Sequence, residues 1–320
     1  MKKLRVLLLV HESLVPPDDI KDDEDPRLAE VQTEYDVKQA LIELGHDVNT
    51  FGFYDDFLAL HQVISEWKPD IVFNLTEDFA GIGEDDHFIV GYLEMMKIPY
   101  TGSNTRGMVL ARDKAVSKKI LHYHGIKVPD FEVFPFGSVP SRIRPLPYPL
   151  IVKGLREEGS VGIAQASYVE NEEQLRKRVE AVHDITQDDA IAEQYIHGRE
   201  FYIAVTGNDR LDVYPIRELV FNKLAKDQPR MATYKVKWDS KYRERWGIDY
   251  IFARNMAKGM KQKIIDLCKQ VYRLHELSGY ARIDLRLTPE GELYVLEANP
   301  NPGIADGEDV AFSAEKAGIS

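Results

Sequence analysis

Residues 280–303 read YARIDLRLTPEGELYVLEANPNPG, and the interpretation of the whole chain starts from this stretch. Two runs of alternating, β-rich residues, 280–287 and 292–299, flank a turn that contains Pro289 and Gly291. Alternation on both sides of such a turn predicts an antiparallel β-hairpin. The hairpin leads into a stiff Pro-Asn-Pro-Gly loop, which a simple surface hairpin does not need.

Polar side chains alternate along both predicted strands. Side chains two positions apart share a face, so Arg282 lies with Asp284 and Glu297 lies with Asn299. A tight turn that begins at Thr288 places Arg282 opposite Glu297 and all four side chains on one face. A bulged turn would shift the register by one residue and split the set, so the single face is a prediction with an open alternative.

This polar set combines two carboxylates, an amide oxygen and a cation. Carboxylate and amide oxygens suit Mg²⁺, with phosphate oxygens and water in its remaining positions. The cation suits a developing negative charge. The alternative is that the charges only cover the solvated side of a hairpin. The expected metal ligands are Asp284, Glu297 and Asn299.

The composition is that of a globular protein with two or three modest domains. The chain has 320 residues, of which 44% are hydrophobic and 29% are charged. Its 53 acidic and 41 basic residues give a formal net charge of -12, which argues against nucleic acid or an anionic membrane as the main partner. The single cysteine, Cys268, excludes an internal disulfide framework and is expected to be buried.

The N-terminal third predicts an open α/β domain. Its apolar run at 4–10 is typical of a strand buried in a parallel sheet. The run is too short for a signal peptide or a membrane span, so we expect a cytoplasmic location. The predicted elements that follow are an acidic loop at 16–26, a helix from Glu30 to Leu44 and strands at 48–53 and 71–74.

Several motifs resemble those of the ATP-grasp enzymes, specifically the D-alanine:D-alanine ligase group. That group carries Arg-Ile-Asp followed by Glu-Ala-Asn and a Pro-Gly loop, as residues 282–303 do, and its first domain closes with Pro-Tyr-Thr-Gly, as at 99–102. A lysine followed by a loop with glycine and serine matches Lys153 and residues 156–162, and such loops can fold backbone amides over phosphates.

The resemblance implies a mixed α/β protein with the ATP-grasp fold. The expected parts are an N-terminal open α/β domain at 1–103, a central subdomain at 104–197 and a C-terminal subdomain at 198–320. ATP would lie between the last two, with adenine read by an extended backbone and phosphates held by lysines. Carried over by position, the ATP-binding residues are Lys114, Lys153, Glu193, Gln194, Ile196 and Glu200.

The resemblance also implies chemistry through an acyl phosphate, which an amine then attacks to form an amide. Two magnesium ions, with manganese as a substitute, would neutralise the phosphates. The expected catalytic residues are Arg282, Gly303, Ser160 and Lys237, with the Arg282 side chain and the Gly303 amide on the oxyanion.

The chain departs from the family pattern at several positions. Gly159 stands where the family often has a first serine, and Trp238 replaces a tyrosine in the mobile loop expected within 231–251. Glu308 and Asp309 occupy the place of a Ser-Leu pair that receives the second substrate's carboxylate in D-alanine ligases. Because carboxylates repel one another, we expect an amine partner that is cationic or lacks a carboxylate there, or a loop that is rebuilt.

Two other functions stay open at this point. One is an ATP-grasp ligase for L-amino acids or peptides, and the other is a non-catalytic ATP-binding regulator, which the missing serine and tyrosine suggest. We expect small amino acids or amines as partners, a homodimer as one oligomeric option, and neither nucleic acid nor membrane. The chain ends at Ser320, where relatives usually continue into a last helix, which suggests a trimmed product.

Overall fold

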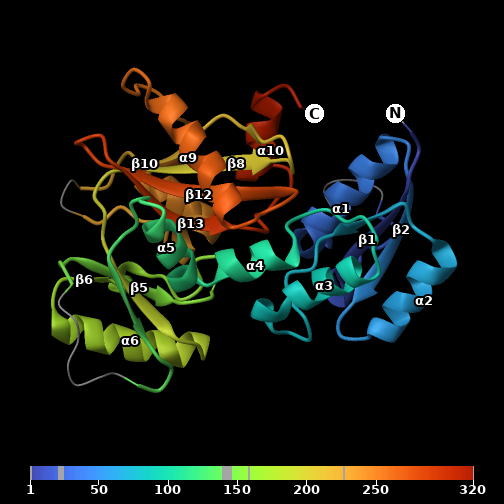
Figure 1. Cartoon of the computed structure of the whole chain (residues 1–320), viewed down its shortest axis with the longest axis horizontal. Helices are drawn as coiled ribbons and strands as arrows, with labels where there is room; N and C mark the ends of the chain where they lie inside the picture. The colour runs from blue at the N-terminus through green and yellow to red at the C-terminus, as the bar shows by residue number, and fades with distance from the viewer. Residues whose placement is uncertain (1, 21–24, 139–145, 158, 226–227, 320) are drawn as a thin grey trace.

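The computed structural model describes residues 2–20, 25–138, 146–157, 159–225 and 228–319. Part of the predicted acidic loop (21–24), the predicted loop residue Glu158 and the terminal Ser320 lie outside the described residues. The described chain forms three sheets, which Figure 1 shows as separate groups joined through α4 (Thr105–Arg112).

The first sheet is parallel and has the order β2-β1-β3. Its central strand β1 (Arg5–His11) is buried on both faces, as its continuous apolar sequence predicts. The neighbours are β2 (Asp47–Phe53) and β3 (Ile71–Asn74). The helices and short turns of this part are η1 (Glu12–Leu14), α1 (Leu28–Glu43), α2 (Phe57–Trp67), η2 (Gly83–Asp85) and α3 (His87–Met95).

The central sheet is antiparallel and has the order β4-β7-β5-β6. Its strands are β4 (Phe131–Phe134), β5 (Leu150–Gly154), β6 (Tyr168–Val169) and β7 (Ala190–Gln194), with η3 (Gln165–Ser167) before β6. The helix α6 (Glu172–Thr186) packs its apolar stripe on this sheet. A second helix, α5 (Lys114–Tyr123), begins where the Asp113 carboxylate accepts hydrogen bonds from two backbone amides, and it contacts the large sheet.

The large sheet has the order β11-β10-β8-β12-β13, and β9 pairs with the C-terminal end of β8. Its strands are β8 (Arg199–Thr206), β9 (Asp212–Val213), β10 (Arg217–Phe221), β11 (Ile248–Phe252), β12 (Tyr280–Leu287) and β13 (Leu293–Asn299). The amphipathic helix α9 (Met260–Leu274) shares one core with β8, β12 and β13, and this core includes the buried Cys268. The remaining helices are α7 (Tyr234–Trp238), α8 (Ser240–Trp246) and α10 (Asp309–Lys316).

The predicted hairpin is present, but its predicted register is wrong. Leu287 pairs with Leu293, so the turn is longer by one residue than a tight turn from Thr288 to Gly291. A bulge then adds a second shift at Leu296, and Arg282 lies opposite Asn299, not Glu297. Two shifts of one residue restore the side-chain alternation, so the four polar side chains still share a face.

Another predicted element also differs from the structure. Residues 231–251, expected to contain a mobile loop, contain α7, α8 and most of β11, because Thr233 and Asp239 cap the two helices. Strand β9 ends before Pro215, which has no N–H to donate to a ladder. Tyr100 forms a single bridge to Val72. The predicted domain boundaries stay a prediction.

Candidate active site

A cleft lies between the central and the large sheet. Strands β5, β7, β8, β12 and β13 all contribute to its walls. Of the predicted site residues, those that line it are Lys153, Ser160, Glu193, Gln194, Ile196, Glu200, Lys237, Asp284 and Glu297. The predicted residues outside its lining are Lys114, Arg282, Asn299 and Gly303.

Asp284 is the centre of the polar face of the hairpin. Arg282 binds it with two hydrogen bonds, Nε to Oδ1 at 2.8 Å and Nη2 to Oδ2 at 3.0 Å. The side-chain amide of Asn299 donates to the same carboxylate at 3.2 Å. The side chains of Arg282 and Asp284 are both nearly buried. The cation and the carboxylate are therefore paired.

The two carboxylates of the hairpin have different protonation behaviour. Burial raises the pKa of Asp284 to about 6 against the opposing charge of Arg282, and the charge of Glu297 adds to the increase. Burial also acts to raise the pKa of Glu297, but the charges of Lys153 and other cations outweigh it and hold that pKa well below its usual range. Glu297 is thus the carboxylate that stays charged.

A chain of buried charges connects the two sheets beneath the cleft. Lys153 Nζ lies 3.2 Å from Glu193 Oε2 and 3.7 Å from Glu297 Oε2. Lys118 Nζ lies 2.9 Å from Glu193 Oε1. Glu193, one of the predicted ATP-binding residues, is therefore held between two lysines. The charges of these lysines keep its pKa below the ordinary value although burial opposes this.

Arg286 organises the end of the cleft that contains the predicted ATP-binding residues Ile196 and Glu200. This guanidinium donates to Glu200 Oε2 at 3.1 Å and to the Ile196 carbonyl at 2.6 Å. It also donates to the Arg230 carbonyl and lies 4.9 Å from the centre of the Tyr195 ring. The other oxygen of Glu200 accepts a hydrogen bond from the Tyr202 hydroxyl at 2.6 Å.

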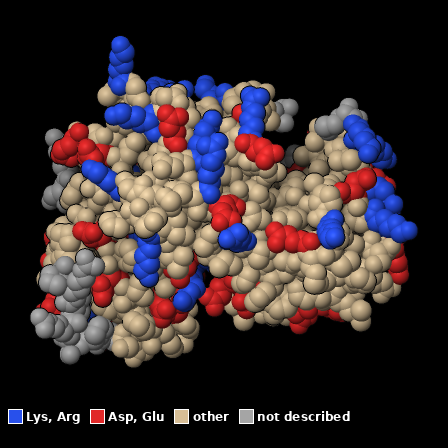
Figure 2. All heavy atoms as spheres, in the orientation of Figure 1, with Lys and Arg blue, Asp and Glu red and all other residues tan. Residues whose placement is uncertain are grey.

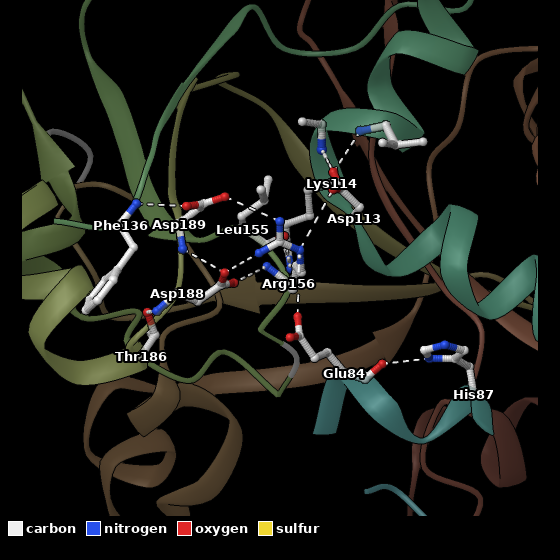
Figure 3. Close-up of polar contacts among 12 residues, drawn as sticks. Glu84, His87, Asp113, Lys114, Phe136, Leu155, Arg156, Thr186, Asp188 and Asp189 are labelled. Atoms are coloured by element: carbon white, nitrogen blue, oxygen red, sulfur yellow. Dashed lines mark hydrogen bonds and ion pairs between the residues drawn. The ribbon is translucent and has the colours of Figure 1, made fainter. Parts of the chain in front are cut away.

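Lys114 belongs to a separate network at the base of the glycine-containing loop (Figure 3). Its Nζ donates to the carbonyls of Leu155 and Glu157, which flank Arg156. Arg156 in turn forms ion pairs with Asp188 and with three more carboxylates, those of Asp189, Glu84 and Asp113. Glu84 comes from η2, so this network joins the N-terminal part of the chain to the loop.

The two loops that border the cleft contact each other. Ser160 Oγ donates to the Ala232 carbonyl at 2.9 Å, and the Trp238 indole N–H donates to the Gly159 carbonyl at 3.0 Å. These contacts occur although the chain lacks the serine and the tyrosine of the resembled pattern. Lys237 lies between them in the cleft, where burial and the charge of Arg282 lower its pKa.

The loop after the hairpin reaches the N-terminal part of the chain. The Asn301 side chain donates to the Thr76 carbonyl at 3.3 Å. Gly303 follows it and is exposed. Asp309, at the start of α10, lies 3.2 Å from Arg217 Nε. One of the two carboxylates predicted to repel a substrate carboxylate is thus largely neutralised by this arginine, whereas Glu308 is exposed.

Sequence reasoning missed Lys118, Arg286 and Arg156. For two of them, the spacing from a predicted site residue could have indicated their position. Lys118 is four residues after Lys114 in α5, on the same helix face, and Arg286 is two residues after Asp284 on β12. Arg156 carries no such signal, because its carboxylate partners lie far from it along the chain.

The hairpin fits magnesium only together with a bound phosphate. Among the described residues, no group of three His, Cys, Asp or Glu side chains is placed to hold a metal ion. The donors available are the carboxylates of Asp284 and Glu297 and the side-chain oxygen of Asn299. Mg²⁺ commonly takes one or two carboxylates and completes its shell with substrate phosphates and water, which is the set that this cleft provides.

Charges on the visible face of the molecule are mixed. Figure 2 shows acidic and basic side chains interspersed, without a continuous basic surface on that face. In the described part of the chain, no helix is both long and apolar enough to span a bilayer.

Two sheets that enclose a cleft lined by lysines and acidic residues define the ATP-grasp class. Residues 120–320 match the family model described as D-ala D-ala ligase C-terminus. The chain is 31% identical over 242 residues to a D-alanine–D-alanine ligase of Desulforudis audaxviator, covering 75% of this chain and 74% of that protein. It is 32% identical over 290 residues to D-alanine–D-alanine ligase B of Pseudomonas putida, covering 88% and 82%.

A solved structure gives the same fold. The crystal structure of D-alanine–D-alanine ligase from Bacillus anthracis complexed with ATP matches with a TM-score of 0.72 and 21% identity, covering 99% of this chain and 92% of that one. The chain therefore belongs to the D-alanine–D-alanine ligase family of ATP-dependent carbon–nitrogen ligases. The predicted family, fold class and enzyme class are confirmed, and the second substrate stays open.

Proposed function

We propose that this protein uses ATP to join the carboxylate of one small amino acid to the amine of a second substrate. In the first step a substrate carboxylate oxygen attacks the γ-phosphorus, the bond to the β-γ bridging oxygen breaks, and ADP leaves. In the second step the amine nitrogen attacks the acyl carbon, the carbon–oxygen bond to phosphate breaks, and the amine loses a proton. The products are an amide, ADP and phosphate.

The proposed nucleotide site runs along β7 and the segment after it. The backbone of Gln194 and Ile196 would read the edge of adenine, with Glu193 beside the amino group and Glu200 at the ribose. Lys153 and Lys237 line the same cleft and would hold the phosphates. Lys114 would act with them through the loop whose carbonyls it binds.

Asp284, Glu297 and Asn299 would hold magnesium, which supplies positive charge to neutralise the phosphates during transfer. Arg282 and the Gly303 amide would stabilise the oxyanion formed when the amine attacks. Ser160 keeps the glycine-containing loop closed through the Ala232 carbonyl. The observation that carries the proposal is the joint placement of Lys153, Glu297 and Asp284 in the lining of one cleft.

For the second substrate we propose an amine whose carboxylate does not lie against α10. The exposed Glu308 next to Gly303 supports this, because it disfavours an approaching carboxylate. The salt bridge between Asp309 and Arg217 leaves Glu308 as the main source of this repulsion.

The test is a screen of D-amino acids, L-amino acids, dipeptides and diamines for acceptor-dependent ADP release. We expect release with at least one donor and acceptor pair, and a loss of roughly 100-fold or more in Asp284→Asn. Asp209→Asn, an exposed carboxylate on the β8–β9 turn, serves as the matched control and should keep full activity. ATP binding without acceptor-dependent release across the panel would contradict the proposal, and efficient D-alanyl-D-alanine formation would contradict the acceptor preference.

A further inference from the structure

We propose that Lys118 is a positioning residue that holds the bulge of β13 and thereby keeps Glu297 on the cleft side of the hairpin. This inference rests on the proposed function, because it assigns Glu297 to the metal. It concerns the second layer of residues around the site, since Lys118 is outside the lining of the cleft.

The bulge decides on which side of β13 the Glu297 carboxylate lies. Val295 and Ala298 are both buried in the core shared with α9, although they are three residues apart. Regular alternation from Val295 would send Glu297 into this core. Because Leu296 has no partner in the register of β12, the alternation reverses and Glu297 points to the cleft.

A bulge leaves backbone groups without a ladder partner, and Lys118 supplies one. Its Nζ donates to the Leu296 carbonyl at 2.6 Å. A buried carbonyl needs such a donor, since an unpaired one costs about as much as a lost hydrogen bond. The donor comes from α5, which contacts β13.

The same ammonium group is one end of a chain of buried charges. It lies 2.9 Å from Glu193, which lies 3.2 Å from Lys153, which lies 3.7 Å from Glu297. Lys118 thus shares the Glu193 carboxylate with Lys153 and keeps Lys153 from being drawn fully to Glu193. The position of Glu297 and the balance of charges around its carboxylate therefore both depend on Lys118.

A purely structural role explains this lysine poorly. The Lys118 side chain is only 1% exposed, and a buried ion pair usually contributes less to stability than an apolar residue of similar volume. A methionine would fill the same space without a desolvation cost. A charged ammonium group, by contrast, can bind the Leu296 carbonyl at the bulge and the Glu193 carboxylate at the same time.

The test compares Lys118→Met with Lys119→Met. The control residue is the next one in α5, carries the same charge and is exposed. Binding of Mn²⁺ is measured by electron paramagnetic resonance in the presence of a non-hydrolysable ATP analogue. We expect Lys118→Met to weaken Mn²⁺ binding by roughly 10- to 100-fold, the usual effect of removing a residue that supports a metal ligand. Lys119→Met should stay within about twofold of wild type, as expected for an exposed residue remote from the site.

A role in folding alone would give a different pattern. The unfolding midpoint would fall while Mn²⁺ binding by the folded fraction stayed at the wild-type value, and this result would overturn the inference. Lys118→Gln, which keeps a hydrogen-bond donor, replaces the Met variant if that variant does not fold, with the same expected direction. Because the measurement needs no turnover, wild-type Mn²⁺ binding without any ligase activity would count against the proposed function and not against the role of Lys118.

Discussion

At the scale of single residues, Arg286 connects the groups at the end of the cleft where we propose that the nucleotide binds. Its guanidinium joins the Glu200 carboxylate, the Ile196 carbonyl and the Arg230 carbonyl. Ile196 and Glu200 belong to residues 194–200, the proposed nucleotide segment. Arg230 belongs to the segment that leads into α7. A buried guanidinium with so many acceptors fixes them relative to one another, because its planar fork allows only one orientation.

We therefore expect Arg286→Met to damage nucleotide binding and stability together. Among the described residues, the substitution leaves the buried Glu200 carboxylate with the Tyr202 hydroxyl as its one hydrogen-bond partner, so the free energy of unfolding should fall by about 3 kcal/mol. The KM for ATP should rise about 10-fold, which corresponds to the loss of roughly 1.4 kcal/mol of binding energy, while the KM for the amino-acid substrates stays unchanged.

Urea unfolding and initial rates at varied ATP measure these two effects. Arg210→Met is the control, because the Arg210 side chain is 90% exposed and lies 3.8 Å from an exposed Asp212. Its unfolding free energy should change by less than about 0.5 kcal/mol. An unchanged KM for ATP in Arg286→Met would show that Arg286 does not position the nucleotide segment.

At the scale of elements, α9 and α5 are joined by a buried histidine. His275 follows the last turn of α9, and its Nδ1 donates to the Val271 carbonyl at 2.9 Å. Its Nε2 lies 2.7 Å from Ser117 Oγ on α5. A carbonyl can only accept, so the neutral ring donates from Nδ1 and accepts the Ser117 hydroxyl at Nε2. Protonation would remove that acceptor.

This contact predicts a loss of stability in mild acid. Burial lowers the pKa of His275, and the charge of Lys118 acts in the same direction, whereas the hydrogen bond to Val271 opposes it. Because the folded pKa lies below the unfolded value of about 6.5, the unfolded chain binds more protons between the two values. Stability should therefore be full above pH 6.5 and fall as the pH decreases, by up to about 1.4 kcal/mol per pH unit from this group.

His275→Gln, which keeps a polar group in the same place, isolates this contribution. We expect it to lower the free energy of unfolding at pH 7.5 by about 1–2 kcal/mol and to have a shallower decrease between pH 7 and pH 5.5 than wild type. His124→Gln is the control, since that side chain is exposed at the end of α5. Parallel pH profiles for wild type and His275→Gln would contradict the assignment.

At the scale of the whole molecule, the N-terminal part meets the hairpin through close backbone contacts. Gly279 precedes β12, and a Cβ built there would lie 2.3 Å from the Gly102 carbonyl oxygen. Asn301, beyond the hairpin, donates to the Thr76 carbonyl, and Arg156 lies 3.7 Å from Glu84. The position of the N-terminal part thus depends on both ends of the hairpin and on the glycine-containing loop.

Gly279→Ala should weaken the contact between the N-terminal part of the chain and the hairpin. The glycine has φ +65, and the contact is with backbone that has no side-chain freedom to move aside. We expect a loss of about 3 kcal/mol in unfolding free energy, from the left-handed conformation together with the overlap. Amide hydrogen exchange should also rise around Gly102 and Thr76.

The matched control is Gly137→Ala, because Gly137 has φ +71 and no atom of the described residues lies within 4 Å of an added Cβ. Only the conformational cost of about 1–2 kcal/mol applies to it. Equal losses for the two variants would show that the contact between Gly102 and Gly279 contributes nothing to stability.

Much of the fold was predictable because its signals are local. The apolar run of β1, the stripe of α9 and the alternation of β12 each follow from the geometry of one element. Since β12 has no irregularity of its own, Arg282 and Asp284 share a face as predicted. The motifs also identified the family, because their residue types and their order along the chain can be read without any knowledge of contacts.

What the sequence determined by itself is therefore the elements with strong local patterns, the family and many of the residue types at the cleft. The tertiary structure alone decided the register of the hairpin, the bulge at Leu296 and the partners of the buried charges. The physical reason is distance along the chain: Lys118 meets Leu296 across 178 positions, and Arg286 meets Glu200 across 86. No local pattern encodes such pairs, because each forms only after two separately folded segments pack and exclude water.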